Sequence, residues 1–235
     1  MKLLYRFMSV LLPLCLICCL PVIASAIKYE DYTVFDVSVH EEADFFEKIG
    51  FTTSDIKING NAFSNFAVSE QGKVALFFDS DKAAINVYDS HGEFLYGYSF
   101  VNGGAAFALF FEGEVLSMVW GKELYIASFD AEGNCLAFGG YKNTKGNADA
   151  YHQDRYPPNS GQVGNIRYDA SKIRLCPNYT RFIIEDETGE KTEIYDATKE
   201  MRARCTIIWA VVISAVMAVL MIKRKNKISE AFCVK

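Results

Sequence analysis

The sequence predicts an all-β fold, built as an antiparallel meander of short strands, followed by one C-terminal transmembrane α-helix. Three observations lead to this prediction. Two long apolar segments, at 1–26 and 206–222, bracket the chain of 235 residues. The stretch between them is rich in Phe and Tyr, which favour the half-buried surface of a sheet. Short apolar runs recur in that stretch at spacings of about eight to twelve residues, as in antiparallel all-β domains.

Residues 1–26 have the three parts of a secretory signal peptide. A positively charged start precedes an apolar stretch at 7–23, and small residues at Ala24 and Ala26 form an A-x-A cleavage site. We therefore expect signal peptidase to cleave after Ala26. An uncleaved signal anchor is the alternative.

The second apolar segment, 206–222, carries no charged residue. At about 1.5 Å per residue, a helix of this length is near the lower limit for crossing a hydrocarbon core. It is apolar on every face and ends in the basic cluster 223–227, which is typical of a stop-transfer segment. We expect a single-pass type I protein of the cell membrane, with its domain outside the cytoplasm. A buried core helix is the alternative.

The expected domain organisation has five parts. They are a signal peptide at 1–26, an extracytoplasmic β-rich domain at 27–196, a juxtamembrane segment at 197–205, the transmembrane helix at 206–222 and a cytoplasmic basic tail at 223–235. Asp196 is placed to cap a helix that continues into the span without a linker. Lys199, Arg202 and Arg204 place positive charge outside the membrane, against the usual orientation rule.

Within the exported domain, most segments read as strands. Seven strands are expected, at 73–79, 84–89, 94–100, 106–112, 115–120, 123–130 and 181–187. One short amphipathic helix is expected at 41–49, where Phe45, Phe46 and Ile49 share a face and His40 is placed to cap the first turn. Residues 143–162 are polar and turn-rich, and this composition predicts a long loop.

An internal repeat organises the strands. Residues 85–95 (INVYDSHGEFL) recur as 126–136 (IASFDAEGNCL), with an offset of 41 residues, and a weaker copy lies at 182–189. Each copy ends a strand in Asp and places Gly three residues later, where a hairpin turn needs a positive φ. A period near 40 residues is typical of a four-stranded propeller blade.

Residues 66–76 (FAVSEQGKVAL), taken together with 85–95, resemble one blade of the NHL-type six-bladed β-propellers. The shared order is a strand, a glycine turn, a strand, and then a hairpin of the form I-x-V-F-D-x-x-G. The resemblance implies a propeller-like meander, and it fades after Gly140. Two or three copies are too few to close a propeller, so the expected domain has incomplete blades. A blade carries no chemistry of its own.

The cysteines and the charge balance limit which cofactors and partners are expected. Cys135 and Cys176 are a candidate disulfide in an oxidising compartment, and two buried free thiols are the alternative. The exported part has no CxxC pair and no nucleotide or metal motif, so we expect no metal and no cofactor. The net charge of −5 and the lack of a basic stripe at 27–196 argue against a nucleic-acid partner.

One cluster is a candidate binding site, made of Tyr151, His152, Arg155 and Tyr156 in the expected loop. Aromatic side chains and arginine on a loop are typical of binding hot spots. A surface loop without a partner is the alternative. We find no catalytic motif, so we expect no enzyme activity.

These observations favour a membrane-anchored surface protein whose β-domain binds a protein or a glycan, or which serves as an accessory subunit of a membrane complex. The alternative is an extracytoplasmic hydrolase with an unrecognised active site. The lipid bilayer is an expected partner through 206–222. Ala210, Ser214 and Ala218 recur at intervals of four on one helix face, which predicts a weak homodimer.

Overall fold

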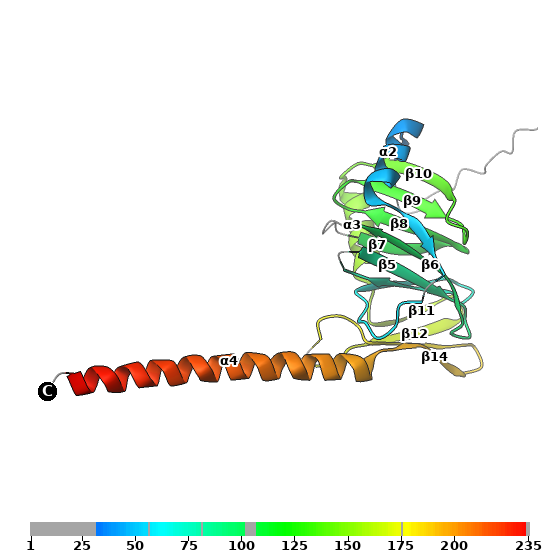
Figure 1. Cartoon of the computed structure of the whole chain (residues 1–235). Helices are drawn as coiled ribbons and strands as arrows, with labels where there is room; N and C mark the ends of the chain where they lie inside the picture. The colour runs from blue at the N-terminus through cyan, green and yellow to red at the C-terminus, as the bar shows by residue number, and fades with distance from the viewer. Residues whose placement is uncertain (1–31, 56, 81, 102–106, 175, 234–235) are drawn as a thin grey trace, which may run out of the picture. The chain divides into compact units, whose positions relative to one another are not determined.

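The computed structural model describes residues 32–55, 57–80, 82–101, 107–174 and 176–233. These residues form a mostly β domain with three antiparallel sheets, and a C-terminal helix, α4 (Thr198–Cys233) (Figure 1). The expected signal peptide, with its cleavage site at Ala24 and Ala26, lies outside the described residues.

Each sheet is built from four strands that follow one another in the chain. The first sheet contains β3 (Asn65–Val68), β4 (Val74–Phe78), β5 (Lys82–Tyr88) and β6 (Phe94–Val101), with β2 (Thr52–Ser54) added beside β6. The second contains β7 (Phe107–Glu112), β8 (Val115–Trp120), β9 (Tyr125–Phe129) and β10 (Cys135–Tyr141), with β1 (Val34–Asp36) added beside β10. The third contains β11 (Ser160–Val163), β12 (Ile166–Ser171), β13 (Arg181–Glu185) and β14 (Lys191–Asp196).

The first sheet forms the middle layer of the domain (Figure 1). Successive side chains of a strand point to opposite faces of the sheet. Both faces of the first sheet are covered, so its strands carry apolar side chains on both. On β4, Phe77 packs into a cluster shared with the second sheet, whereas Leu76 and Phe78 pack into a cluster shared with the third sheet. The strand β4 is accordingly buried throughout its length.

The repeated D-x-x-G turns have the predicted geometry. Each joins the third and fourth strands of its sheet. In the first turn, the Asp89 carboxylate accepts the backbone N–H of His91 at 2.8 Å. The glycines Gly92, Gly133 and Gly189 have φ angles of 82°, 85° and 83°. The sequence repeat therefore corresponds to a structural repeat of three hairpins.

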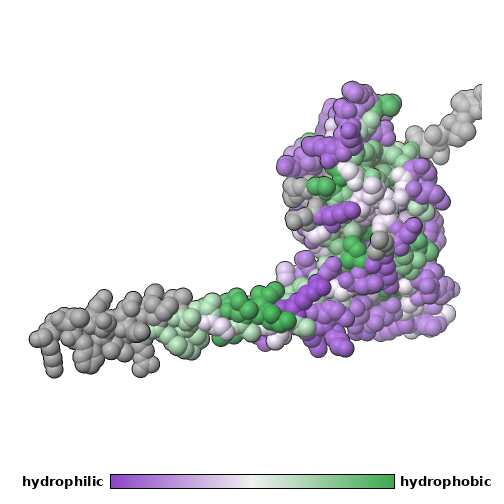
Figure 2. Space-filling model, viewed as in Figure 1, coloured by the Kyte–Doolittle hydropathy of each residue, from purple (hydrophilic) through white to green (hydrophobic). Residues whose placement is uncertain are grey.

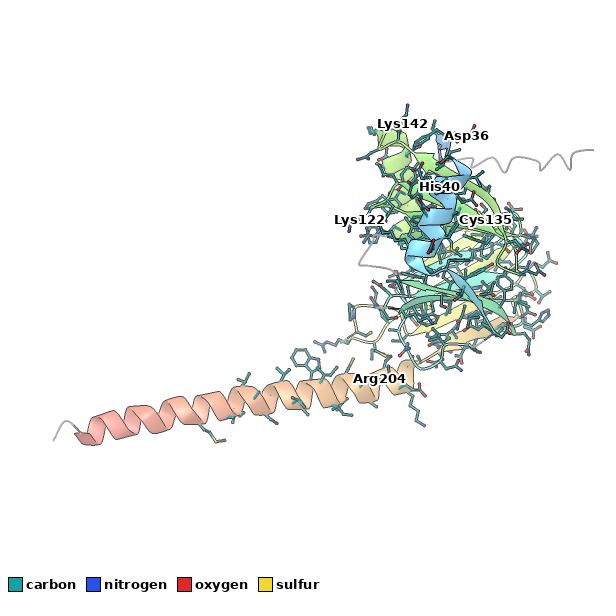
Figure 3. The ribbon with its side chains drawn as sticks, turned by 45° about the horizontal axis from the view of Figure 1, so that its top comes forward. Asp36, His40, Lys122, Cys135, Lys142 and Arg204 are labelled. Carbon is teal, nitrogen blue, oxygen red and sulfur yellow. The ribbon has the colours of Figure 1, made fainter. Side chains whose placement is uncertain are left out.

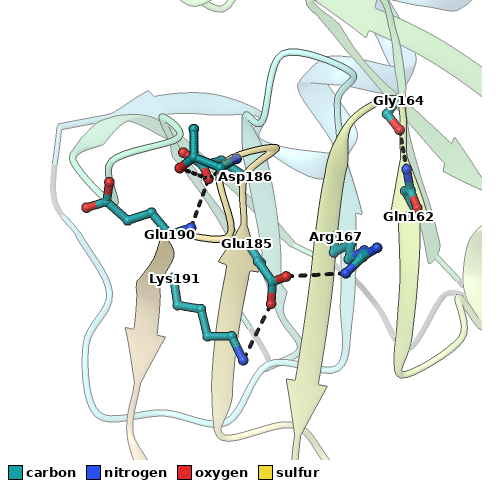
Figure 4. Close-up of polar contacts among 8 residues, drawn as sticks. Gln162, Gly164, Arg167, Glu185, Asp186, Glu190 and Lys191 are labelled. Atoms are coloured by element: carbon teal, nitrogen blue, oxygen red, sulfur yellow. Dashed lines mark hydrogen bonds and ion pairs between the residues drawn. The ribbon is translucent and has the colours of Figure 1, made fainter.

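The seven expected strands are confirmed as β4 to β9 and β13. The strands β1, β2, β3 and β10 were not among them, and neither were β11, β12 and β14 of the third sheet. One face of this sheet is charged, so its apolar residues alternate with polar ones and form no continuous run. On that face the Glu185 carboxylate lies 3.4 Å from both Arg167 and Lys191 (Figure 4). No further sheet covers this face within the part of the chain that the structure describes. A closed propeller is not confirmed.

The expected helix at 41–49 is confirmed as α2 (Val39–Ile49), and Phe45 and Ile49 are buried. The prediction that His40 caps it was wrong. The cap is Ser38, whose hydroxyl accepts the backbone N–H of Glu41 at 3.2 Å. A serine in extended conformation satisfies an unpaired N–H of the first turn, as N-cap residues generally do.

The prediction of a loop throughout 143–162 was also wrong. The helix α3 (Lys145–Arg155) occupies its first half. Thr144 caps the helix by accepting the backbone N–H of Asn147 at 3.3 Å. The segment is polar because its helix is largely exposed, and tertiary contacts rather than an apolar stripe hold it in place.

The helix α4 follows β14 without a linker, as predicted. The Asp196 carboxylate accepts the backbone N–H of Thr198, the first residue of the helix, at 2.7 Å. Among the described residues, one helix is long and apolar enough to cross a membrane, with its candidate span at Thr198–Ala218. No residue of the apolar stretch in this span is buried against the domain. The start of α4 beside the domain is hydrophilic, and the stretch that follows it is hydrophobic on the face shown (Figure 2).

Candidate functional site

The helix α3 is fixed to the residues that lead into β1, the edge strand of the second sheet, by polar contacts near both of its ends. Asn147, which is 2% exposed, accepts the backbone N–H of Thr33 at 2.9 Å and donates to the Thr33 carbonyl at 3.1 Å. At the other end, the Tyr32 hydroxyl donates to the Asp154 carboxylate at 2.8 Å. Burial, followed by the Asp154 charge, raises the pKa of Tyr32, so the hydroxyl stays protonated as a donor. These contacts give α3 a defined place on the domain.

The structure brings the four candidate binding residues together at the C-terminal end of α3. The Arg155 guanidinium donates to the Tyr151 hydroxyl at 3.1 Å and lies 5.1 Å from the ring centroid of Tyr156. The rings of His152 and Tyr156 are 4.9 Å apart. The cluster is therefore a real surface feature, although its residues belong to a helix and its C-cap rather than to a loop.

The members of this cluster differ in what they contact. Tyr151 is half-buried, and a Cβ atom added at Gly121 would lie 2.6 Å from its ring, so Tyr151 holds α3 against the second sheet. Tyr156 is 58% exposed. Binding to another molecule is therefore open to Tyr156 and His152, whereas Tyr151 and Arg155 support them.

An apolar groove of about 200 Å³ runs beside the end of α3. Its lining comes from β3 of the first sheet, β7 of the second sheet, the end of α3, the Pro157-Pro158 pair, and β11 and β12 of the third sheet. The lining residues are Phe66, Ala67, Val68, Leu109, Phe110, Phe111, Gln153, Asp154, Pro157, Pro158, Val163 and Tyr168. All three sheets thus contribute to one concave surface next to the aromatic cluster.

Sequence reasoning missed this groove because its walls are far apart in the chain. Buried Asn65, the first residue of β3, links this strand to β7 and to α3. Its side-chain amide donates to the carbonyl of Phe107 at 3.4 Å and to that of Asp154 at 3.3 Å. The Pro157-Pro158 pair was a local signal for an irregular segment, and it borders the groove. No local pattern could show that 66–68 and 109–111 lie side by side.

Cys135 and Cys176 are both free cysteines in the structure. Cys135 begins β10 of the second sheet (Figure 3), whereas Cys176 lies between β12 and β13 of the third sheet. The first sheet separates these two sheets, so the candidate disulfide is not formed. Burial, followed by the neighbouring Glu42 carboxylate, raises the pKa of the Cys135 thiol to about 12. Cys135 is thus a packed thiol rather than a nucleophile.

The site is lined mainly by apolar side chains. Across the described ranges, no group of three or more His, Cys, Asp or Glu side chains is arranged to hold a metal ion. The groove offers apolar walls with a polar rim at Gln153 and Asp154, which suits an apolar side chain flanked by peptide groups.

Comparison with known proteins adds no assignment. A scan against protein-family models, a search of curated proteins and a search of solved structures all found no match.

Proposed function

We propose that this chain is a single-pass, membrane-anchored surface protein that binds a partner polypeptide through the groove beside α3. The helix α4 anchors it, and the signal peptide exports the domain, which therefore lies outside the cytoplasm at the cell membrane. The partner is a soluble protein or another subunit of a membrane complex. In this role the three antiparallel sheets serve as a scaffold that presents the groove.

The observation that carries the proposal is a groove to which all three sheets contribute, with exposed His152 and Tyr156 next in the chain to the lining residues Gln153 and Pro157. Exposed aromatic residues beside a preformed concave surface are the usual anchors of an interface. The apolar walls favour a polypeptide over a glycan, because sugars need many polar contacts. The alternative of a hydrolase receives no supporting observation from the described part of the chain.

Site-specific photo-crosslinking in native membranes tests this proposal. A photoreactive phenylalanine analogue replaces Tyr156 in one variant of the full chain and Leu136 in a control variant. Leu136 is 45% exposed and belongs to β10, away from the groove lining. We expect one discrete crosslinked product from position 156 and none from position 136. Equal crosslinking from both positions, or none from 156, would overturn the proposal.

A matched pair of substitutions provides a second test. Tyr156→Ala should weaken co-purification of the crosslinked partner at least tenfold, because a truncated hot-spot residue commonly costs about 2 kcal/mol or more. Leu136→Ala should leave co-purification unchanged. Both side chains are exposed, so the melting temperature should stay the same in both variants.

A further inference from the structure

A basic pocket lies where the connection between β12 and β13 meets the first turns of α4. Its volume is about 370 Å³. The lining residues are Lys172, Ile173 and Arg174 from the connection, and Arg202, Cys205 and Thr206 from α4. Three of these six side chains are cationic and none is a carboxylate. The net charge of the whole chain is −5, so this pocket has the opposite sign to the protein that carries it.

In the described part of the chain, no ion pair with a carboxylate neutralises the cations of this pocket. Lys172 is held in place, because its ammonium donates to the Pro177 carbonyl at 3.2 Å and lies 4.7 Å from the ring centroid of Tyr179. Arg174 and Arg202 are exposed, and among the described residues no ion pair joins either of them to a carboxylate. Two guanidinium groups therefore remain available to an anion.

Arg204, two residues after Arg202 on α4, makes a contact that these two arginines do not share. Its guanidinium donates to the side-chain oxygen of Asn61 at 2.6 Å, so it ties α4 to the domain (Figure 3). Arg204 is thus engaged with the domain and does not line the pocket, whose two arginines are Arg174 and Arg202.

The position of the pocket along α4 corresponds to the headgroup layer of a bilayer. Thr206 is the first residue of the expected span, and Arg202 lies one turn before it, about 6 Å along the helix axis. The headgroup layer on each side of a bilayer is roughly 5–8 Å thick. Trp209, which is 46% exposed, follows on the same helix, and indole rings favour this interface.

We propose that this pocket binds the phosphate group of an anionic membrane lipid in the leaflet where α4 enters the bilayer. The inference rests on the proposed anchoring by α4. Guanidinium groups pair with phosphate oxygens through two parallel hydrogen bonds, and Lys172 adds a point charge. The partly buried Ile173 side chain provides an apolar contact for the lipid glycerol and acyl region.

This binding site also explains why positive residues precede the expected span on its outer side. Positive residues outside the membrane oppose the usual orientation of a span, so their presence next to α4 calls for a reason. A lipid phosphate that neutralises Arg174 and Arg202 supplies one. It also counters the repulsion between an anionic membrane surface and a protein with net negative charge.

The test titrates phosphatidylglycerol into the full chain in neutral detergent and counts bound lipids by native mass spectrometry. The test variant carries Arg174→Gln and Arg202→Gln. The control variant carries Lys122→Gln and Lys142→Gln, which remove the same charge from exposed positions that flank strands of the second sheet (Figure 3). Phosphatidylcholine and inorganic phosphate are titrated in parallel, and carbonate extraction of native membranes measures anchoring separately.

We expect the wild-type chain and the control variant to bind phosphatidylglycerol with equal affinity. The test variant should bind it about twenty-fivefold more weakly, since each of the two removed charges near a membrane surface is worth about fivefold. Equal affinity of the test variant and the wild type overturns the proposal, and so does inorganic phosphate that competes at the same concentration as the lipid. Release of the chain by carbonate would overturn the anchoring, whereas an anchored chain without lipid preference would overturn this inference alone.

Discussion

At the scale of single residues, the glycines of the D-x-x-G turns show how one local rule acts in three surroundings. All three have a positive φ, which non-glycine residues rarely adopt. Their neighbours differ. A Cβ atom at Gly189 would have no atom within 4 Å, whereas one at Gly92 would lie 3.2 Å from the Glu193 carbonyl oxygen. One at Gly133 would lie 2.2 Å from the Thr53 methyl group.

These surroundings predict a graded effect of alanine. Gly189→Ala should lower the free energy of unfolding by about 1–2 kcal/mol, the cost of a left-handed backbone alone. Gly92→Ala and Gly133→Ala should cost more, because the new methyl group also presses on a neighbouring sheet. Chemical denaturation of the full chain in detergent measures all three. Equal losses in the three variants would contradict the contribution of these contacts.

At the scale of elements, α2 shows how an amphipathic helix is retained by one face. Phe45 is 5% exposed, and its ring centroid lies 5.1 Å from that of Trp120 and 4.9 Å from that of Tyr125. Val39, on the same helix, is 82% exposed. The helix is short, so these aromatic contacts rather than helix propensity hold it on the domain.

Truncating a side chain should have a large effect on the buried face of α2 and a small effect on its exposed face. Phe45→Ala should lower the free energy of unfolding by about 3–5 kcal/mol, because it leaves a cavity between aromatic rings. Val39→Ala should change it by less than about 0.5 kcal/mol. Thermal unfolding followed by near-UV circular dichroism reports both. A small effect of Phe45→Ala would mean that α2 does not depend on this contact.

The helix α4 makes a separate prediction about self-association. The Ser214 hydroxyl donates to the Ala210 carbonyl at 2.7 Å, so it is already bonded within its own helix. Packing of the small residues Ala210, Ser214 and Ala218 is then the contribution that remains for a dimer. Ser214→Ala should leave association in a bilayer reporter unchanged, whereas Ser214→Ile should reduce it. If Ile has no effect, this face is not the interface.

At the scale of the whole molecule, buried tyrosines link stability to pH in both interfaces between sheets. Tyr98 belongs to the cluster between the first and second sheets, and Tyr88 and Tyr195 belong to the cluster between the first and third sheets. Burial raises the pKa of all three hydroxyl groups, that of Tyr195 to about 12. An ionised phenolate inside either cluster would lose its hydration.

The domain should therefore lose stability at alkaline pH. Unfolded tyrosines release their protons near pH 10, whereas the folded ones retain theirs. Above pH 10 the folded state binds more protons, so the free energy of unfolding falls as pH rises, and below about pH 9 it is unaffected. Melting temperatures measured from pH 8 to pH 11.5 test this. Tyr98→Phe should give a shallower decline, and an identical slope would rule out a role for Tyr98.

The sequence by itself determined the features that depend on neighbouring residues. Its apolar segments predicted one helix able to cross a membrane, and its alternating runs predicted seven strands. Asp and Gly spaced three residues apart predicted hairpins with a positive φ at Gly92 and Gly133. In each case the relevant contacts lie within a few residues, so the local pattern contains the information.

Tertiary structure alone decided the features that join distant segments. Strands β12 and β14 pair with β13 and pack apolar residues against the first sheet, and β11 pairs with β12. The groove needs 66–68 beside 109–111, and the basic pocket needs Arg174 beside Arg202. The physical reason is that burial and charge clustering depend on which faces meet in space, and no local pattern records that choice.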